Sequence, residues 1–147
     1  MKIDTRASDI ITRFNQYTDW EDRYKELINL GRKAQGQISG TPDDKYLVKG
    51  CQSQVWLIPE YSNGRVYFTA DSDASIVKGI VLLLVQVYSD STPMEILNDK
   101  SEFLSKIGIT EHLSMNRTNG LASMLKQIKM YAMVYQSLAD KGISDAP

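Results

Sequence analysis

The chain has 147 residues, 42% of them hydrophobic, and its 17 Lys and Arg against 18 Asp and Glu give a net charge of -1. A chain of this length can bury a full core as one domain without disulfides or a structural metal. The balanced charge argues against a nucleic-acid binder and against polybasic attachment to a membrane. One cysteine and one histidine exclude a disulfide framework, thiolate-cluster metal sites and the usual multi-histidine metal centres.

The N-terminal sequence predicts a cytoplasmic protein. Met1–Tyr17 mixes charged and apolar residues, whereas a secretory signal needs an uninterrupted apolar stretch. The longest apolar run, Gly79–Val85, is too short to span a bilayer. The cytoplasm would also keep the single thiol reduced.

Two N-terminal helices are expected from the spacing of apolar residues. Ser8 or Thr5 is the expected cap of the first helix, whose apolar face follows from Ile10 onward. The second helix is expected to begin near Asp19 and to stop at Gly31. The polar, Gly-rich segment 31–45 then reads as a surface loop within the same domain.

The middle of the chain predicts β-structure. Val55–Ile58 and Arg65–Thr69 are rich in β-branched and aromatic residues, and Asn63–Gly64 between them is a favoured hairpin turn. Tyr46–Val48 is a further candidate strand. We therefore expect a small antiparallel sheet of three strands.

The second half of the chain predicts helices. Ala74–Tyr88 is apolar nearly all round, which favours a central buried helix, with Asp71 or Ser72 as its cap. Carboxylates at a helix start also explain Asp71 and Asp73 more simply than a metal or acid–base role does.

The C-terminal part begins with a capping-box pattern, Thr92–Glu95, with Pro at the first helical position. A turn or two is expected over Ser101–Ile107, and a long amphipathic helix from about Ser114. Residues 142–147 read as a frayed tail. The expected fold class is α+β, in one domain over residues 1–147.

Cys51 is the first candidate for chemistry, because the chain has no other thiol. Its neighbours from Lys49 to Gln54 are polar, whereas a buried structural cysteine usually lies among apolar residues. Gly50 gives the backbone freedom to place the thiol at a loop tip. Local context alone leaves a reactive and an incidental cysteine equally open.

A lone thiol supports few reactions. A cysteine hydrolase or transferase would need His112 as its base, although an exposed histidine at a helix end is the simpler interpretation. An iron–sulfur scaffold needs several thiolates, and a thioredoxin-type oxidoreductase needs a second cysteine. Transfer of a sulfur atom between two proteins needs one thiol only. An interaction module without thiol chemistry is a third possibility.

Two basic residues are candidates for activating that thiol, because nearby positive charge lowers the pKa of a cysteine. Lys49 lies two residues from Cys51 in the sequence. Arg117 lies in the first turn of the last predicted helix, where a cation is unfavourable for the helix dipole.

One motif is specific: the heptapeptide from Gly50 to Trp56 reads GCQSQVW. It resembles the signature of the SufE family, the sulfur-acceptor proteins of iron–sulfur cluster biogenesis. The resemblance continues in order from Trp20 to Ile128, through these segments: Trp20–Glu21, Asp71–Ala74, Ile76–Gly79, Thr92–Pro93, His112–Leu113, Arg117, Gly120–Leu121 and Met124.

The resemblance implies a SufE/IscU-like fold, in which helices pack around a small antiparallel sheet. It implies a protein without a cofactor or metal of its own that accepts persulfide sulfur from a pyridoxal-phosphate cysteine desulfurase of the SufS or CsdA type. Such a protein stimulates the desulfurase and passes sulfur towards a SufBCD-type assembly complex. A monomer or weak dimer is expected.

The resemblance also assigns site residues. Cys51 matches the acceptor cysteine of the family, and we expect it to be shielded in the free protein and exposed on docking. The other matches belong to the acceptor loop and the partner surface: Gly50, Gln52, Ser53, Gln54, Asp73 and Arg117.

Overall fold

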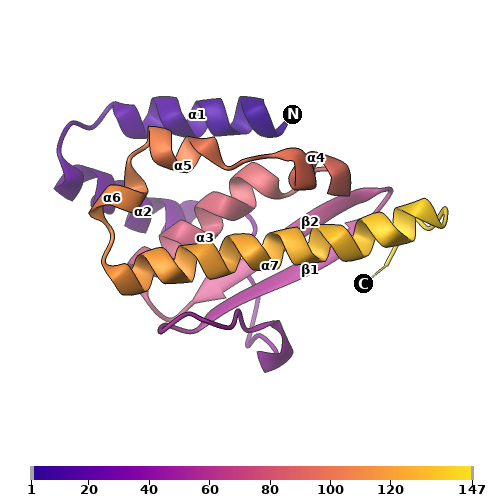
Figure 1. Ribbon diagram of the computed structural model, residues 1–147. Helices are drawn as coiled ribbons and strands as arrows, with labels where there is room; N and C mark the ends of the chain where they lie inside the picture. Colours follow the sequence, from indigo (N-terminus) through magenta and orange to yellow (C-terminus); the bar gives the residue numbers. More distant parts are fainter. Residues whose placement is uncertain (1, 147) are drawn as a thin grey trace.

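The computed structural model describes residues 2–146 and places a hairpin and a set of helices around one buried helix (Figure 1). In chain order the elements are α1 (Ile3–Asn15), α2 (Trp20–Lys33), the 3₁₀ helix η1 (Asp44–Tyr46), β1 (Val55–Ser62), β2 (Arg65–Ser72), α3 (Ser75–Tyr88), α4 (Pro93–Asn98), α5 (Glu102–Lys106), α6 (Ile109–His112) and α7 (Met115–Asp140).

The centre of the core is α3, as its apolar sequence predicted. Ten of its residues are buried, and it contacts α1, α2, α7 and both strands. Its expected cap was wrong: Ala74 is the N-cap residue, without a side-chain cap. Asp71 and Ser72 instead end β2, because strand pairing continues up to Ser72 opposite Val55.

The hairpin is the regular part of the sheet. β1 and β2 pair antiparallel from Val55 opposite Ser72 to Ser62 opposite Arg65. The predicted turn at Asn63–Gly64 is confirmed, with φ of 53° and 75°. Positive φ at both residues gives a turn whose twist matches the strands.

The expected third strand was wrong, since residues 2–146 contain a sheet of two strands only. Where Tyr46–Val48 was predicted as a strand, Asp44–Tyr46 forms η1, because the Asp43 carboxylate accepts from the Lys45 N–H and turns the chain. What remains of the strand is a single bridge between Leu47 and Trp56.

Loop segments cover both edges of the hairpin, which blocks edge-to-edge pairing with other chains. Gln37 and Ser91 bridge to β2. On β1, Ala146 exchanges two backbone hydrogen bonds with Tyr61. The tail was expected to fray, yet it lies against the hairpin as far as Ala146; Pro147 lies outside the described residues.

The N-terminal helices follow the prediction except at two ends. α1 begins at Ile3, after Lys2, and so uses neither Ser8 nor Thr5 as its cap. α2 begins where expected, just after Asp19, whose side chain caps the helix by accepting from the Glu21 N–H. Gly31 does not stop that helix, which continues to Lys33. Its lack of a side chain instead allows α2 to pack closely on α3, since a Cβ on Gly31 would lie 3.2 Å from the Gly79 nitrogen.

The C-terminal half agrees with its local signals. Thr92 and Glu95 form the predicted capping box, and the Ser114 hydroxyl caps α7 by accepting from the Arg117 N–H. α7 runs along the length of the molecule in front of the hairpin (Figure 1). Stacking of Tyr61 on Tyr135, with ring centroids 4.9 Å apart, fixes α7 against β1.

Candidate functional site

Cys51 lies in the loop that leads into β1, just after a turn at Lys49–Gly50. Gly50 has a φ of +91°, a left-handed conformation that favours glycine. A Cβ on Gly50 would also lie 2.5 Å from the Ser123 hydroxyl oxygen of α7. The left-handed backbone therefore favours glycine before the cysteine, whereas the Ser123 hydroxyl can rotate away from an added Cβ.

The base of this loop is held on both sides. The Val48 N–H donates to the Val55 carbonyl oxygen at 2.8 Å. From the end of β2, the Asp73 carboxylate accepts from the Gln54 N–H at 3.0 Å, and the Ser72 hydroxyl donates to the Gln54 carbonyl oxygen at 2.7 Å. The loop therefore leaves the sheet in a fixed direction.

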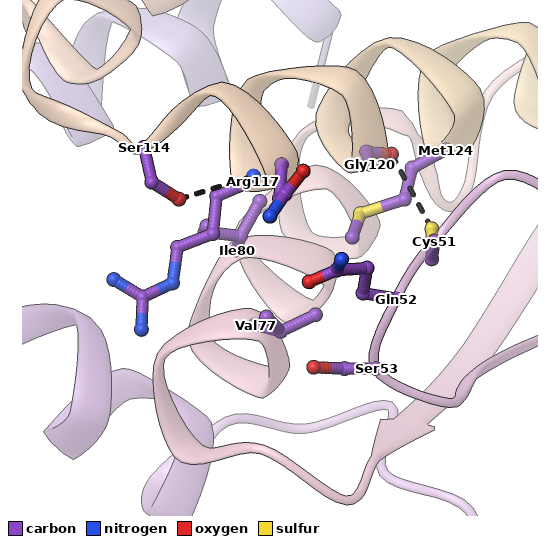
Figure 2. A pocket seen from close by; sticks show the side chains of 10 residues that line it. Cys51, Gln52, Ser53, Val77, Ile80, Ser114, Arg117, Gly120 and Met124 are labelled. Atoms are coloured by element: carbon purple, nitrogen blue, oxygen red, sulfur yellow. Dashed lines mark hydrogen bonds between the residues drawn. The ribbon is translucent and has the colours of Figure 1, made fainter.

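The thiol itself rests on α7. Cys51 is half-buried, and its Sγ donates to the Gly120 carbonyl oxygen at 3.6 Å (Figure 2). Gly120 is buried, and a Cβ there would lie 3.5 Å from Sγ, in ordinary van der Waals contact. A glycine at this point of α7 leaves the sulfur room against the helix backbone.

A cavity of ≈ 310 Å³ opens beside the sulfur. Its floor is apolar, from Val77 and Ile80 of α3 and Met124 of α7. Polar side chains from the loop and the start of α7 complete it: Gln52, Ser53, Ser114, Asn116 and Arg117. Figure 2 shows Cys51 and Arg117 at opposite sides of the cavity.

Arg117 contributes a cation to the lining of this cavity. Its side chain is exposed and lines the cavity, and among residues 2–146 its guanidinium has no hydrogen-bond or ion-pair partner. Lys49 is exposed as well, and it does not line the cavity.

Neither cation activates the thiol in the free protein. Burial raises the pKa of the Cys51 thiol above its ordinary value, and no nearby charge opposes that shift. Neither of the candidates, Lys49 and Arg117, contributes to the shift of that pKa in this arrangement. The pKa of the thiol is raised because α7 covers one side of the sulfur and excludes water from it, while no cation lies close enough to stabilise the thiolate.

We expect alkylation of folded Cys51 by iodoacetamide to rise with pH around a midpoint above that of the protein unfolded in urea. The thiolate is the reacting form, and burial disfavours it in the folded state. By linkage, the thiol's contribution to stability is present below the unfolded pKa and is lost as pH rises through the folded pKa. A folded midpoint at or below the unfolded one would mean that a cation does activate Cys51.

His112 takes no part in this site. Its ring stacks on Trp20, with centroids 3.9 Å apart and planes 18° apart, and the Tyr24 hydroxyl donates to its carbonyl oxygen. His112 does not line the cavity, and within residues 2–146 no hydrogen bond joins it to Cys51. The Cys51–His112 pairing of a hydrolase gains no support from this geometry.

The structure brings the sequence-derived residues together in two groups. Cys51, Gln52, Ser53 and Arg117 line the cavity, whereas Gly50, Gln54 and Asp73 hold the loop. Sequence reasoning gave no role to the residues of α7 beneath the thiol, Gly120 and Ser123. A glycine inside a helical pattern was the available signal, since it usually has a packing reason.

Residues 2–146 contain no cluster of three or more His, Cys, Asp or Glu side chains that could hold a metal ion. None of the helices described is both long enough and apolar enough to cross a membrane.

Known proteins match both the sequence and the fold. The SufE family model, described as an Fe-S metabolism associated domain, matches residues 8–132. The chain belongs to the SufE family. Its relatives include an uncharacterized SufE-like protein of Rhizobium etli, 43% identical over 132 residues, which are 85% of this chain and 88% of the relative.

A second SufE-like relative, from Rhizobium meliloti and also uncharacterized, is 38% identical over 135 residues, 87% of this chain and 95% of the relative. The solution structure of a hypothetical protein from Thermus thermophilus has a TM-score of 0.73 at 19% identity, over 90% of this chain and 96% of that one. That likeness supports the fold alone. Membership of the SufE family associates the chain with iron–sulfur metabolism.

Proposed function

We propose that this SufE-family protein accepts sulfur from a cysteine desulfurase and carries it as a persulfide on Cys51. The observation that carries the proposal is a single thiol on a loop with a fixed base, half-buried over a cavity that opens to the surface. Membership of a family associated with iron–sulfur metabolism gives that thiol a sulfur-transfer context.

The transfer step balances without an external oxidant. The Cys51 thiolate attacks the outer sulfur of a persulfide on the desulfurase, so that a new S–S bond forms at Cys51 while the S–S bond of the donor breaks. The donor cysteine leaves as a thiolate. The desulfurase is thereby free to accept the next sulfur from L-cysteine, which is how a carrier would stimulate it.

The loop is suited to move for this step. Among residues 2–146, residues 49–53 take part in no backbone hydrogen bond, and the long contact from Sγ to the Gly120 carbonyl is the one hydrogen bond made by their side chains. Val48 and Gln54 on either side are fixed. We infer that docking withdraws Cys51 from α7, where burial favours the thiol, to the partner's surface, where the thiolate can form.

We propose two roles for the other site residues: contact with the partner and positioning of the loop. Gln52, Ser53 and Arg117 form the polar rim that a partner would meet, and the unpartnered guanidinium of Arg117 is available for an acidic group of that partner. Gly50, Gln54 and Asp73 position the loop. A pyridoxal-phosphate desulfurase of the SufS or CsdA type is the proposed donor, a SufBCD-type complex is the proposed acceptor, and the cytoplasm is the proposed location.

We expect the protein to gain one or more sulfur atoms when it is mixed with a desulfurase and L-cysteine without reductant. Intact-mass spectrometry measures the gain, and Cys51→Ser, which replaces the reacting sulfur by a hydroxyl oxygen, should show none. Added dithiothreitol should remove the extra sulfur. No gain with either desulfurase type, and no change in desulfurase turnover, would contradict the proposal.

A further inference from the structure

The short helix that leads into α7, α6, is held by side chains from the start of α2. The His112 ring stacks on Trp20, with centroids 3.9 Å apart, and the Tyr24 hydroxyl donates to the His112 carbonyl oxygen. Just before α6, the Arg23 guanidinium donates to the Ile107 carbonyl oxygen at 2.9 Å. In Figure 1, α6 lies beside α2 at the end of the molecule where α7 begins. α2 therefore holds both the ring and the backbone of His112.

The Trp20 ring is the centre of this contact, and it is itself packed on several sides. The Arg23 guanidinium carbon lies 5.1 Å from the Trp20 ring centroid. The Tyr24 ring meets Trp20 edge to face, with centroids 5.8 Å apart and planes 62° apart. Gly108 lies so close that a Cβ there would be 3.3 Å from the Trp20 ring. A side chain packed in this way keeps one rotamer, so the ring face on which His112 stacks is fixed in position.

The first turn of α7, by contrast, has little packing of its own. None of residues 115–119 is buried. The turn begins at Ser114, whose hydroxyl accepts from the Arg117 N–H and whose carbonyl oxygen accepts from the Thr118 N–H. Two residues of this turn, Asn116 and Arg117, line the cavity beside the thiol. Helix ends without buried side chains fray, so the placement of both residues depends on how the chain is held just before Ser114.

We propose that Trp20 and Tyr24 are positioning residues for the rim of the cavity, and that they act through His112 on the first turn of α7. The proposal rests on the proposed sulfur transfer, in which the Arg117 guanidinium meets an acidic group of the desulfurase. One residue separates His112 from the Ser114 cap, so a fixed His112 backbone fixes the point where α7 begins. The Arg117 guanidinium then reaches the partner from a formed helical turn. His112 thus has a role from outside the cavity, without contact with the reacting sulfur.

Amide hydrogen exchange of the free protein, followed by NMR, tests the positioning without a desulfurase. We expect the Arg117 and Thr118 amides to exchange about three- to tenfold faster in His112→Ala, because an aromatic stack is lost and the turn opens more often. His112→Phe keeps an aromatic ring against Trp20 and should restore the slow exchange. Rescue of this kind separates stacking from any chemistry of the imidazole.

A second variant and a control complete the exchange experiment. Tyr24→Phe removes the hydrogen bond to the His112 carbonyl oxygen, leaves the ring in place, and should also speed the exchange of both amides. Thr110→Ala is the matched control, because Thr110 is exposed on the same short helix, and its exchange should stay that of the unmodified protein. Unchanged exchange in His112→Ala and Tyr24→Phe, an equal increase in Thr110→Ala, or no rescue by His112→Phe would overturn the proposal.

Stimulation of a desulfurase tests whether His112 acts through Arg117. His112→Ala should raise the protein concentration needed for half-maximal stimulation about threefold, because docking requires the formed turn. The maximal turnover should not change, since Cys51 and its loop are intact. In an Arg117→Ala background, His112→Ala should have no further effect on that concentration. An unchanged concentration in the single variant, or a full further effect in the double variant, would contradict the proposal.

The two measurements also separate this proposal from the proposed function. If the unmodified protein neither stimulates a desulfurase nor gains sulfur from it, the sulfur-transfer function fails. Amide exchange still decides in that case whether Trp20, Tyr24 and His112 hold the start of α7, because it uses the free protein. If stimulation is normal and the exchange of the His112→Ala variant is unchanged, the positioning fails while the sulfur-transfer function stands.

Discussion

A Gly79→Ala variant is expected to lose about 3 kcal/mol of folding stability, at the upper end of what overpacking a core costs. A Cβ on Gly79 would lie 2.2 Å from the Leu27 carbonyl oxygen and 2.7 Å from the Leu27 carbonyl carbon. These are backbone atoms of α2, which cannot rotate away as a side chain can. α2 and α3 would have to separate, and α3 is the centre of the core.

Thermal unfolding measures this effect. At about 2–4 °C per kcal/mol for a chain of this size class, the midpoint should fall by about 6–12 °C. Gly120→Ala is the matched control, since Gly120 is also a buried glycine inside a helix, but its Cβ would meet only the Cys51 side chain, with the sulfur at 3.5 Å. That variant should gain up to about 1 kcal/mol from helix propensity. A Gly79→Ala midpoint equal to that of the unmodified protein would refute the close helix crossing.

Gly31 and Gly79 show where sequence reasoning stops. The capping box of Thr92 and Glu95 and the starts of α2 near Asp19 and of α7 near Ser114 were predicted correctly, because each depends on hydrogen bonds within a few residues. Gly31 was predicted as a helix end for the same local reason. Its real role is the contact with Gly79, and nothing in either sequence segment indicates that these two helices cross there.

The prediction of a third strand was wrong for a related reason. Tyr46–Val48 has strand composition, but strand formation depends on partners that are distant in the sequence. Asp43 offers a local hydrogen bond that turns the chain, so Leu47 and Val48 reach β1 through a single bridge and one backbone hydrogen bond only. At the end of β2, the opposite happened: pairing with Val55 outweighed the local tendency of Ser72 to cap a helix.

The candidate site was predicted mostly through family resemblance. Cys51 could be chosen from the residue count alone, while Arg117 was matched as a family position and does line the same cavity. The direction of the thiol pKa could not be predicted, because it depends on how closely α7 covers the sulfur. Composition reports how many charges a chain has, and only the fold decides whether burial or charge dominates at one atom.

An Asp73→Ala variant is expected to make Cys51 about five- to tenfold more reactive towards iodoacetamide at neutral pH. The Asp73 carboxylate holds the Gln54 N–H at 3.0 Å and so fixes one side of the loop base. A hydrogen bond of this kind contributes about 1–1.5 kcal/mol. Its loss shifts the equilibrium by about that amount towards conformers in which the thiol has left Gly120.

Asp71→Ala is the control, because it removes the same charge two residues earlier. Asp71 pairs with Lys78 at 3.4 Å and makes no hydrogen bond to the loop. Its alkylation rate should match that of the unmodified protein, with thermal unfolding confirming that both variants are folded. Equal alkylation rates in Asp73→Ala and Asp71→Ala would mean that the contact of the Cys51 sulfur with Gly120 of α7, rather than the loop base, controls access to the sulfur.

Sulfur uptake from a desulfurase then separates two roles of the same carboxylate. If Asp73 only restricts access, Asp73→Ala should take up sulfur faster in proportion to its alkylation rate. If Asp73 also orients the loop towards the partner, the alkylation rate rises while sulfur uptake does not. Iodoacetamide reacts with any exposed thiol, whereas the persulfide of a docked desulfurase reacts only with a thiol that the loop positions next to it. The fixed base beneath a loosely held tip favours the second result.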